Sequence, residues 1–379
     1  MDLDLTPEQE MLRDSVRGLC ARHCDRSVVR ALEDDPVGYP LDLWNQLGAL
    51  GLLGMTLPEE HGGSGMSMLD ATIVYFELGR ALAPTPHFAS AVLAGGVLAR
   101  CGATRWLGGV TSGESIIVPA WLEPGGGYGP AGVTLTAART QDGYTLSGTK
   151  RHVPFASSAT RLLVLARTGP GPDGVVYALV DPASAGVTLT QQMTIASDTQ
   201  YRVDLEGVAI DSDNVIGAGW GTWDRVMHEG IILLAAQAVG GARHALEITT
   251  QYAKDRHQFD KPLGAFQALA HYLADAATAV DGAETLLLEA AWAASEGRDI
   301  GRLAPMAKLF ACRTFRDVTA MAQQIFGGVG FTLDYDIQLY FRRAKQLELS
   351  YWDSRYLEDL VAADVLDRDE GRRPTKAAV

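Results

Sequence analysis

The 379-residue sequence is poor in cysteine and has no long uninterrupted apolar segment. Its longest apolar run, from Gly230 to Ala242, is too short to cross a bilayer, so the sequence predicts no membrane span. It opens with acidic residues, Met1-Asp2-Leu3-Asp4, unlike a signal peptide. Scattered cysteines are typical of reduced thiols in a large intracellular protein. We therefore expect a cytoplasmic location.

Basic residues are also scarce, with 32 Lys and Arg against 46 Asp and Glu and a formal net charge of −14. This balance disfavours a nucleic-acid partner, because such binding uses Lys and Arg to neutralise phosphates. Cys20, His23 and Cys24 would share one helical face, but a structural zinc site needs four ligands and no fourth lies near, so we expect no metal. The 47% hydrophobic content is sufficient for two or three domains.

Residue patterns divide the chain into a helical, a β-rich and a second helical segment, 1–117, 118–217 and 218–379. In the first, Thr6-Pro7 is typical of a helix start, with Glu10 near the capping-box position, and another helix is expected over Ser67–Leu82. The middle segment predicts a small antiparallel barrel or sandwich with strands at Val133–Leu135, Tyr144–Leu146, Arg161–Ala166, Val175–Val180 and Tyr201–Leu205. The last predicts long helices at Trp223–Asp255, Ala265–Glu296 and Leu303–Phe326.

Three motifs in the last segment resemble signatures of the acyl-CoA dehydrogenase family. Arg256–Gln267 resembles R-x-x-F-G-K followed by F-Q, and Gln324–Gly330 resembles Q-x-x-G-G-x-G. Arg342–Lys345 resembles the R-x-A-K that precedes the catalytic carboxylate. Earlier in the chain, Leu57–Leu82 and Leu146–Lys150 are similar to the P-E-E-x-G-G-S-G and L-x-G-x-K segments. The resemblance covers essentially the whole chain.

The resemblance implies an α+β fold with an N-terminal α-helical domain, a middle β-barrel domain and a C-terminal four-helix bundle. It also implies FAD bound across a subunit interface, where one chain holds the flavin ring and its neighbour clamps the adenosine and pyrophosphate. Residues that match the clamp are Arg256, Phe259, Gln267, Gln324, Gly327 and Gly328. The guanidinium of an arginine can donate two parallel hydrogen bonds to a pyrophosphate. Glycine has no Cβ, so the backbone there can approach the cofactor closely.

The half of the site that holds the flavin ring departs from the family pattern. The segment T-E-P-G-x-G-S-D reads Leu122 to Gly129 here, with Leu122 replacing threonine and Tyr128 replacing serine. Tyr128 is expected to fill space that a pantetheine arm uses. In the strand K-x-W-I-T-N, His152 and Pro154 replace tryptophan and threonine, and proline has no N–H to offer a flavin.

The catalytic glutamate is missing from both places where the family carries it. The family triplet E-G-T reads Tyr351-Trp352-Asp353, and the second location is Gly230. A phenol is mostly protonated at neutral pH, so Tyr351 is a poor base. Glu229, one position from the second location, is the fallback candidate. Glu247 and Glu348 are weaker candidates for the same role.

Three functions follow from this combination. The preferred one is a subunit without a base in an actinobacterial α2β2 acyl-CoA dehydrogenase. It would complete the FAD site of a paralogous partner that binds the acyl-CoA. Family members of this kind act on steroid side-chain CoA thioesters, so the resemblance implies that substrate class, with electron-transfer flavoprotein as acceptor. The first alternative is a self-sufficient homotetrameric dehydrogenase that uses Glu229. The second is a flavin-free interaction scaffold, which would have no use for the clamp residues Arg256, Phe259 and Gln324.

Overall fold

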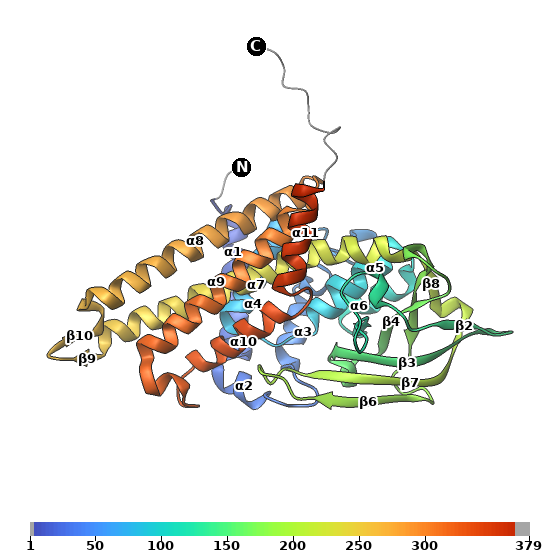
Figure 1. Cartoon of the computed structure of the whole chain (residues 1–379), viewed down its shortest axis with the longest axis horizontal. Helices are drawn as coiled ribbons and strands as arrows, with labels where there is room; N and C mark the ends of the chain where they lie inside the picture. Colours follow the sequence, from blue (N-terminus) through green and yellow to red (C-terminus); the bar gives the residue numbers. More distant parts are fainter. Residues whose placement is uncertain (1–3, 368–379) are drawn as a thin grey trace, which may run out of the picture.

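The computed structural model describes residues 4–367 and has the expected order of a helical, a sheet-containing and a second helical part (Figure 1). The N-terminal helices are α1 (Pro7–His23), α2 (Arg26–Ala31), α3 (Leu41–Ala49), α4 (Met68–Ala81), α5 (Gly95–Arg100) and α6 (Leu107–Ser112). A π-helical segment, η3 (Phe88–Ala94), leads into α5. The capping box of α1 is formed by Thr6 and Gln9, one residue before the Glu10 that the sequence suggested.

The middle part contains two four-stranded sheets, with strand orders β1-β4-β5-β8 and β2-β3-β7-β6. The strands are β1 (Ile117–Ala120), β2 (Ala137–Arg139), β3 (Gly143–Pro154), β4 (Arg161–Arg167), β5 (Val175–Val180), β6 (Val187–Gln192), β7 (Gln200–Asp211) and β8 (Val215–Gly217). Their pairs are antiparallel as predicted, except that β1 runs parallel to β4. A single bridge between Thr136 and Arg167 links the two sheets.

One predicted strand, Val133–Leu135, is wrong and its place is taken by β2 a few residues later. The reason is a competing hydrogen-bond acceptor. The backbone N–H groups of Thr134 and Leu135 both donate to the carboxylate of Glu123, at 3.1 Å. These donors are therefore not available to a β-ladder.

The C-terminal part consists of long helices that pack on one another. They are α7 (Gly219–Asp255), α8 (Gln267–Ser295), α9 (Leu303–Phe326), α10 (Ile337–Leu349) and α11 (Ser354–Leu366), with a short hairpin of β9 (His257–Gln258) and β10 (Lys261–Pro262) after α7. The bounds of α9 agree with the prediction, while α10 and α11 were not foreseen. The domain boundaries at 117 and 217 stay predictions, and residues 368–379 of the last domain lie outside the described part.

Helix α7 joins the two helical parts through close backbone contacts with α4. A Cβ on Gly79 would lie 2.0 Å from the carbonyl oxygen of Gln237, and one on Gly240 would lie 2.0 Å from that of Phe76. Only glycine permits this approach. The crossing brings the N-terminal helices against the same bundle that carries the motif residues.

Helix α7 is also longer than its apolar run suggested. With 37 residues, it is long and apolar enough to cross a membrane by length and composition. However, 72% of its most apolar window is buried inside the protein, as in the core helix of a soluble fold. The length of α7 therefore reflects its central place in the bundle.

Candidate active site

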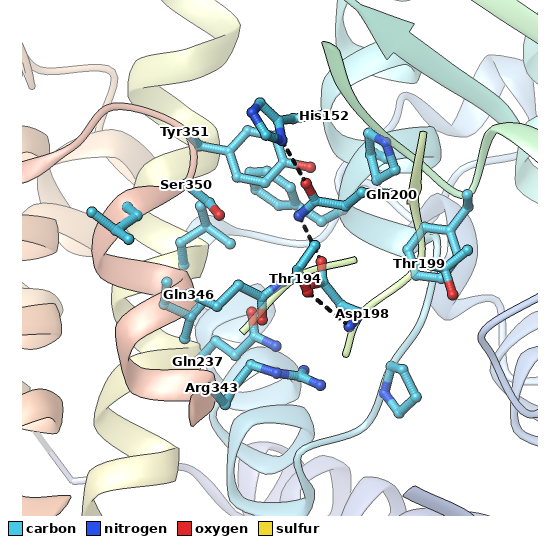
Figure 2. A pocket seen from close by; sticks show the side chains of 18 of the residues that line it. His152, Thr194, Asp198, Thr199, Gln200, Gln237, Arg343, Gln346, Ser350 and Tyr351 are labelled. Atoms are coloured by element: carbon cyan, nitrogen blue, oxygen red, sulfur yellow. Dashed lines mark hydrogen bonds between the residues drawn. The ribbon is translucent and has the colours of Figure 1, made fainter. Parts of the chain in front are cut away.

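A cavity of about 430 Å³ lies where the three parts of the chain meet (Figure 2). Its walls come from α4, η3, the end of β3, the segment between β6 and β7, α7 and α10. The residues that line it include Tyr75, Leu78, Phe88, Trp121, Leu122, Tyr128, His152, Pro154, Phe155, Thr194, Asp198, Gln200, Leu234, Gln237, Arg343, Gln346, Leu349 and Tyr351. This volume falls within the usual range of small-molecule sites. The cavity is also lined by Tyr351, which stands at the first of the two positions where the family carries its catalytic glutamate.

Tyr351 packs against an aromatic ring from the N-terminal part. Its ring centroid lies 4.7 Å from that of Phe88, edge to face at 74°. Burial raises the pKa of Tyr351 well above the ordinary value of a phenol. The phenol therefore stays protonated at neutral pH and cannot act as a carboxylate would.

The second base position is closed by the same ring. A Cβ built on Gly230 would lie 3.3 Å from Phe88 and 3.1 Å from Leu93. Such contacts are tight, so a longer side chain at position 230 would displace its neighbours. Phe88 thus occupies the space between the two positions at which the family carries its base.

The turn that presents Tyr351 is held by a buried lysine. Tyr351 and Trp352 have left-handed backbone, with φ of 50° and 74°, at a cost of roughly 1–2 kcal/mol each for residues other than glycine. The ammonium of Lys308 donates to the carbonyl oxygens of Leu347 (3.1 Å) and Trp352 (2.9 Å), on either side of Tyr351. These two hydrogen bonds fix the turn that follows α10.

Glu229, the fallback base, does not reach this cavity. Its carboxylate forms ion pairs with Arg100 (2.5 Å) and Arg225 (3.4 Å) and lines a different cavity, between α5 and α7. Glu247 pairs with Arg80, and Glu348 with Arg316 and Lys345. None of these three carboxylates lines the cavity that holds Tyr351.

The strand that faces the flavin in the family has no free backbone donor here. Register between β3 and β7 shifts between Lys150 and Val153, and His152 takes a left-handed backbone at φ 54°. The N–H of His152 donates to the side chain of Gln192 at 3.0 Å, and that of Phe155 donates to the Thr199 carbonyl at 3.1 Å. Pro154 between them has no N–H. The residues present on this wall therefore do not fit the hydrogen-bond acceptors of a flavin ring.

A buried ion pair fixes the same wall. The Lys150 ammonium lies 2.7 Å from a carboxylate oxygen of Glu123 and also donates to the Trp121 carbonyl at 3.3 Å. Burial lowers the pKa of Lys150 to about 8. Burial raises the pKa of the Glu123 carboxyl group. The Lys150 ammonium and the hydrogen bonds from Thr134 and Leu135 outweigh this effect and lower the pKa overall. The pair ties the loop after β1 to β3.

Tyr128 lines the cavity within an aromatic cluster. Its ring centroid lies 6.0 Å from that of Trp121 and 5.4 Å from that of Tyr356, and its hydroxyl donates to the Leu349 carbonyl at 3.5 Å. Burial raises its pKa to about 12. This cluster narrows the path between the middle sheets and α10.

The six residues that match the family's clamp lie on the surface at the far end of the bundle. Arg256 ends α7, and its guanidinium makes no hydrogen bond or ion pair within residues 4–367. Phe259 is 86% exposed, and Gln267 and Gln324 are exposed. A Cβ on Gly327 or Gly328 would meet nothing within 4 Å. All six are thus accessible to another molecule.

One aromatic stack brings the two clamp motifs together. Tyr252, one turn before Arg256, stacks on Phe326 with a centroid distance of 4.1 Å, and Phe326 precedes Gly327. Figure 1 shows the β9–β10 hairpin at the end of the bundle opposite to the sheets. The structure therefore places the clamp residues near one another, and away from the cavity of the same chain.

Sequence reasoning missed several cavity residues. Phe88 belongs to a π-helical segment that no motif marks, although π-helical turns are frequent at functional sites. Arg343 fills the variable position of R-x-A-K, so the motif gives it no role. The Glu123–Lys150 pair joins two motifs that were each recognised separately. The sequence carries no local signal that links these two residues, which stand 27 positions apart.

Comparison with known proteins agrees with this architecture. Models of the acyl-CoA dehydrogenase N-terminal, middle and C-terminal domains match residues 6–114, 120–208 and 217–352. The probable acyl-CoA dehydrogenase YngJ of Bacillus subtilis is 31% identical over 97% of this chain and 100% of that protein. The chain therefore belongs to the acyl-CoA dehydrogenase family, whose members are FAD-dependent oxidoreductases acting on CH–CH bonds.

Two similar solved structures are of heteromeric assemblies. A chain of the ChsE4-ChsE5 complex from Mycobacterium tuberculosis superimposes with a TM-score of 0.88 at 28% identity, covering 99% of this chain and 100% of that one. A chain of the Tcur3481-Tcur3483 steroid ACAD, in its G363A variant, gives 0.83 at 32% identity, covering 94% and 98%. The family fold and the three-part organisation predicted from the sequence are confirmed.

Proposed function

We propose that this chain is the subunit without a catalytic base in a heteromeric FAD-dependent acyl-CoA dehydrogenase. The observation that carries the proposal is the contrast between its two half-sites. Phe88 fills the space between the two base positions, Tyr351 and Gly230, while the clamp residues stand exposed at the other end of the bundle. The half that a partner would use is available, and the half that this chain would use alone has no carboxylate at either base position.

In this assembly the chain acts by holding the cofactor. Arg256 offers a fixed fork of donors to the pyrophosphate, and the backbone at Gly327 and Gly328 can approach it closely. The exposed ring of Phe259 covers an apolar face of the cofactor, and Gln324 supplies a hydrogen bond, with Gln267 beside them on α8. When bound, FAD accepts the hydride that leaves the acyl β-carbon. The partner supplies the carboxylate that removes the α-proton.

The α2β2 arrangement and the substrate class belong to the same proposal. Support comes from the two heteromeric relatives, one of which is described as a steroid ACAD. We propose a paralogous acyl-CoA dehydrogenase subunit as partner and a bulky, steroid-like acyl-CoA as substrate, bound mainly by the partner. Electron-transfer flavoprotein would be the acceptor, and the assembly would be cytoplasmic.

The test is the FAD-to-chain ratio of the protein purified alone and with its paralogous partner. We expect no flavin on the isolated chain and about one FAD per two chains in the complex. Arg256→Ala should strip FAD from the complex while the subunits stay folded and associated. The matched control is Arg202→Ala on β7, an exposed arginine outside the clamp, which should keep full occupancy.

Two results would overturn the proposal. One is a full complement of FAD on the isolated chain that an acyl-CoA reduces without the partner. The other is unchanged flavin occupancy in the Arg256→Ala complex.

A further inference from the structure

Arg343, on α10, points into the cavity without a partner (Figure 2). Its Nε–H is enclosed and donates to no hydrogen-bond acceptor, and within residues 4–367 the guanidinium forms no ion pair. The adjacent Arg342 differs, because it pairs with Glu33 and donates to Gln338 at 2.9 Å. Buried charges in folded proteins are normally paired. Arg343 is therefore a half-buried cation in a cavity wall, with no direct hydrogen-bond or ion-pair partner among residues 4–367.

The acidic group nearest to it in the cavity is already engaged. The Asp198 carboxylate accepts hydrogen bonds from the Thr194 hydroxyl and from the amide of Gln200, the latter at 2.7 Å. Burial lowers the pKa of Arg343, although Asp198 and Glu33 act in the opposite direction. Arginine nevertheless stays protonated at neutral pH. The acids of this chain thus leave the positive charge of Arg343 only partly balanced.

Two amide side chains extend the polar wall on which Arg343 lies. Gln346, one turn further along α10, has an enclosed side-chain oxygen without a hydrogen-bond partner. Gln237 from α7 lies beside it in Figure 2. Unpaired buried polar atoms are rare in native proteins, and the two beside this cavity are available to the polar group of a ligand.

The rest of the cavity is largely apolar. Leu78, Phe88 and Leu234 line it, together with the rings of Tyr75 and Tyr351. A ligand that matches both surfaces has an apolar body and one anionic end. Arginine binds carboxylates through two parallel N–H···O bonds, so a carboxylate suits the geometry of its fork.

We propose that this cavity binds an apolar carboxylate, with the carboxylate on Arg343 beside Gln346 and the apolar chain against Phe88 and Leu234. The site is separate from the clamp and gives the subunit a ligand of its own. The same chemistry has two sources: a free carboxylic acid, or the free end of a dicarboxylic acyl chain attached to CoA. The aromatic cluster at Tyr128 narrows the route for a CoA arm, which favours the free acid.

Isothermal titration calorimetry on the full-length chain tests the site with octanoate and octan-1-ol. We expect octanoate to bind at least about tenfold more tightly than the alcohol, as a charge-assisted pair predicts. Arg343→Gln should weaken octanoate binding by about the same factor and leave the alcohol unchanged, and Arg343→Lys should recover part of the loss. Arg202→Gln, on the exposed face of β7, serves as the control and should bind both probes as the parent does.

Thermal unfolding separates this role from a structural one. Because Arg343 has no partner in the described chain, Arg343→Gln should not lower the Tm, whereas a structural arginine would. Equal binding of octanoate and octan-1-ol, no octanoate binding, or full octanoate binding by Arg343→Gln would each overturn the proposal. A clear loss of Tm in that variant would do so as well.

A third set of probes distinguishes the two sources. The mono-CoA thioester of octanedioic acid carries a free carboxylate, and octanoyl-CoA does not. Binding of octanoate but of neither thioester assigns the site to free acids. Binding of octanoate and of the dicarboxylic thioester, but not of octanoyl-CoA, shows that the site also takes the free end of a CoA-linked chain. These titrations need neither flavin nor partner, so their failure would leave the half-site proposal standing, and loss of FAD from Arg256→Ala would not affect them.

Discussion

The ring of Phe88 contacts the ring of Tyr351 edge to face, with centroids 4.7 Å apart. The same ring lies 3.3 Å from the point where a Cβ on Gly230 would stand. One aromatic side chain from the N-terminal part thus adjoins both positions at which the family places its base. A side chain added at position 230 would therefore contact this ring.

Gly230→Glu should therefore destabilise the protein by about 1–3 kcal/mol through overpacking against Phe88 and Leu93. Urea unfolding followed by circular dichroism measures the change. Gly221→Glu is the matched control on the same helix, since a Cβ there meets nothing within 4 Å, and it should be close to neutral. Adding Phe88→Ala to Gly230→Glu should make the glutamate less costly than it is alone. If the two glycine variants are equally stable, Phe88 does not close this position.

Lys150→Met should cost about 3–5 kcal/mol, because it leaves the Glu123 carboxylate buried without its cation. Lys254→Met, at an exposed position near the end of α7, should change stability little. The double variant Lys150→Met/Glu123→Gln should recover part of the loss, since no uncompensated charge remains. Chemical denaturation of all three variants checks this. A loss in the double variant as large as in Lys150→Met would argue against the pair.

The stability of the protein should fall as the pH drops from about 6.5 to about 4, because His87 is neutral and buried in the folded state. Its Nε2–H donates to the Leu52 carbonyl at 2.9 Å, and Nδ1 accepts from the Tyr75 hydroxyl at 2.8 Å, so the neutral ring is fully satisfied. Burial lowers its pKa to about 4. Between these pH values the unfolded chain binds the proton and the folded chain does not, so unfolding is favoured as the pH falls.

The measurement is the free energy of unfolding at several pH values for the parent and for His87→Gln. His87 contributes at most about 1.4 kcal/mol per pH unit to the slope of the unfolding free energy against pH. This contribution vanishes above the pKa that the histidine has in the unfolded chain. His87→Gln retains a donor and an acceptor but does not titrate, so its stability should vary less over this window. Identical slopes in the two proteins would contradict a neutral, buried His87.

Lys308→Met should loosen the turn at Tyr351. It leaves the carbonyl oxygens of Leu347 and Trp352 without their donor, at a cost of about 1–3 kcal/mol. We expect faster amide hydrogen exchange over residues 347–353 in particular. Lys345→Met is the control on the neighbouring helix, because that ammonium is half-exposed and pairs with Glu348 instead. Unchanged exchange at the turn would show that Lys308 does not hold it.

Local patterns in the sequence predicted much of the fold. Strand β5 and helix α9 were found at their observed bounds, Val175–Val180 and Leu303–Phe326. The hydrogen bonds of α9 are local, and β5 is a short, continuous apolar run rich in valine, so periodicity and propensity indicate both directly. The motifs around Arg256 and Gln324 likewise predicted a clamp, and their exposure at one end of the bundle suits that role.

The sequence alone thus determined the family, the order of helical and sheet parts, and the absence of a carboxylate at positions 230 and 351. Only the tertiary structure decided that Phe88 fills that space, that Glu229 faces a different cavity, that Glu123 diverts the strand expected at Val133–Leu135, and that Arg343 lacks a partner. These outcomes depend on contacts between elements far apart in the chain. Packing and charge compensation are properties of the assembled cavity, and no local pattern encodes them.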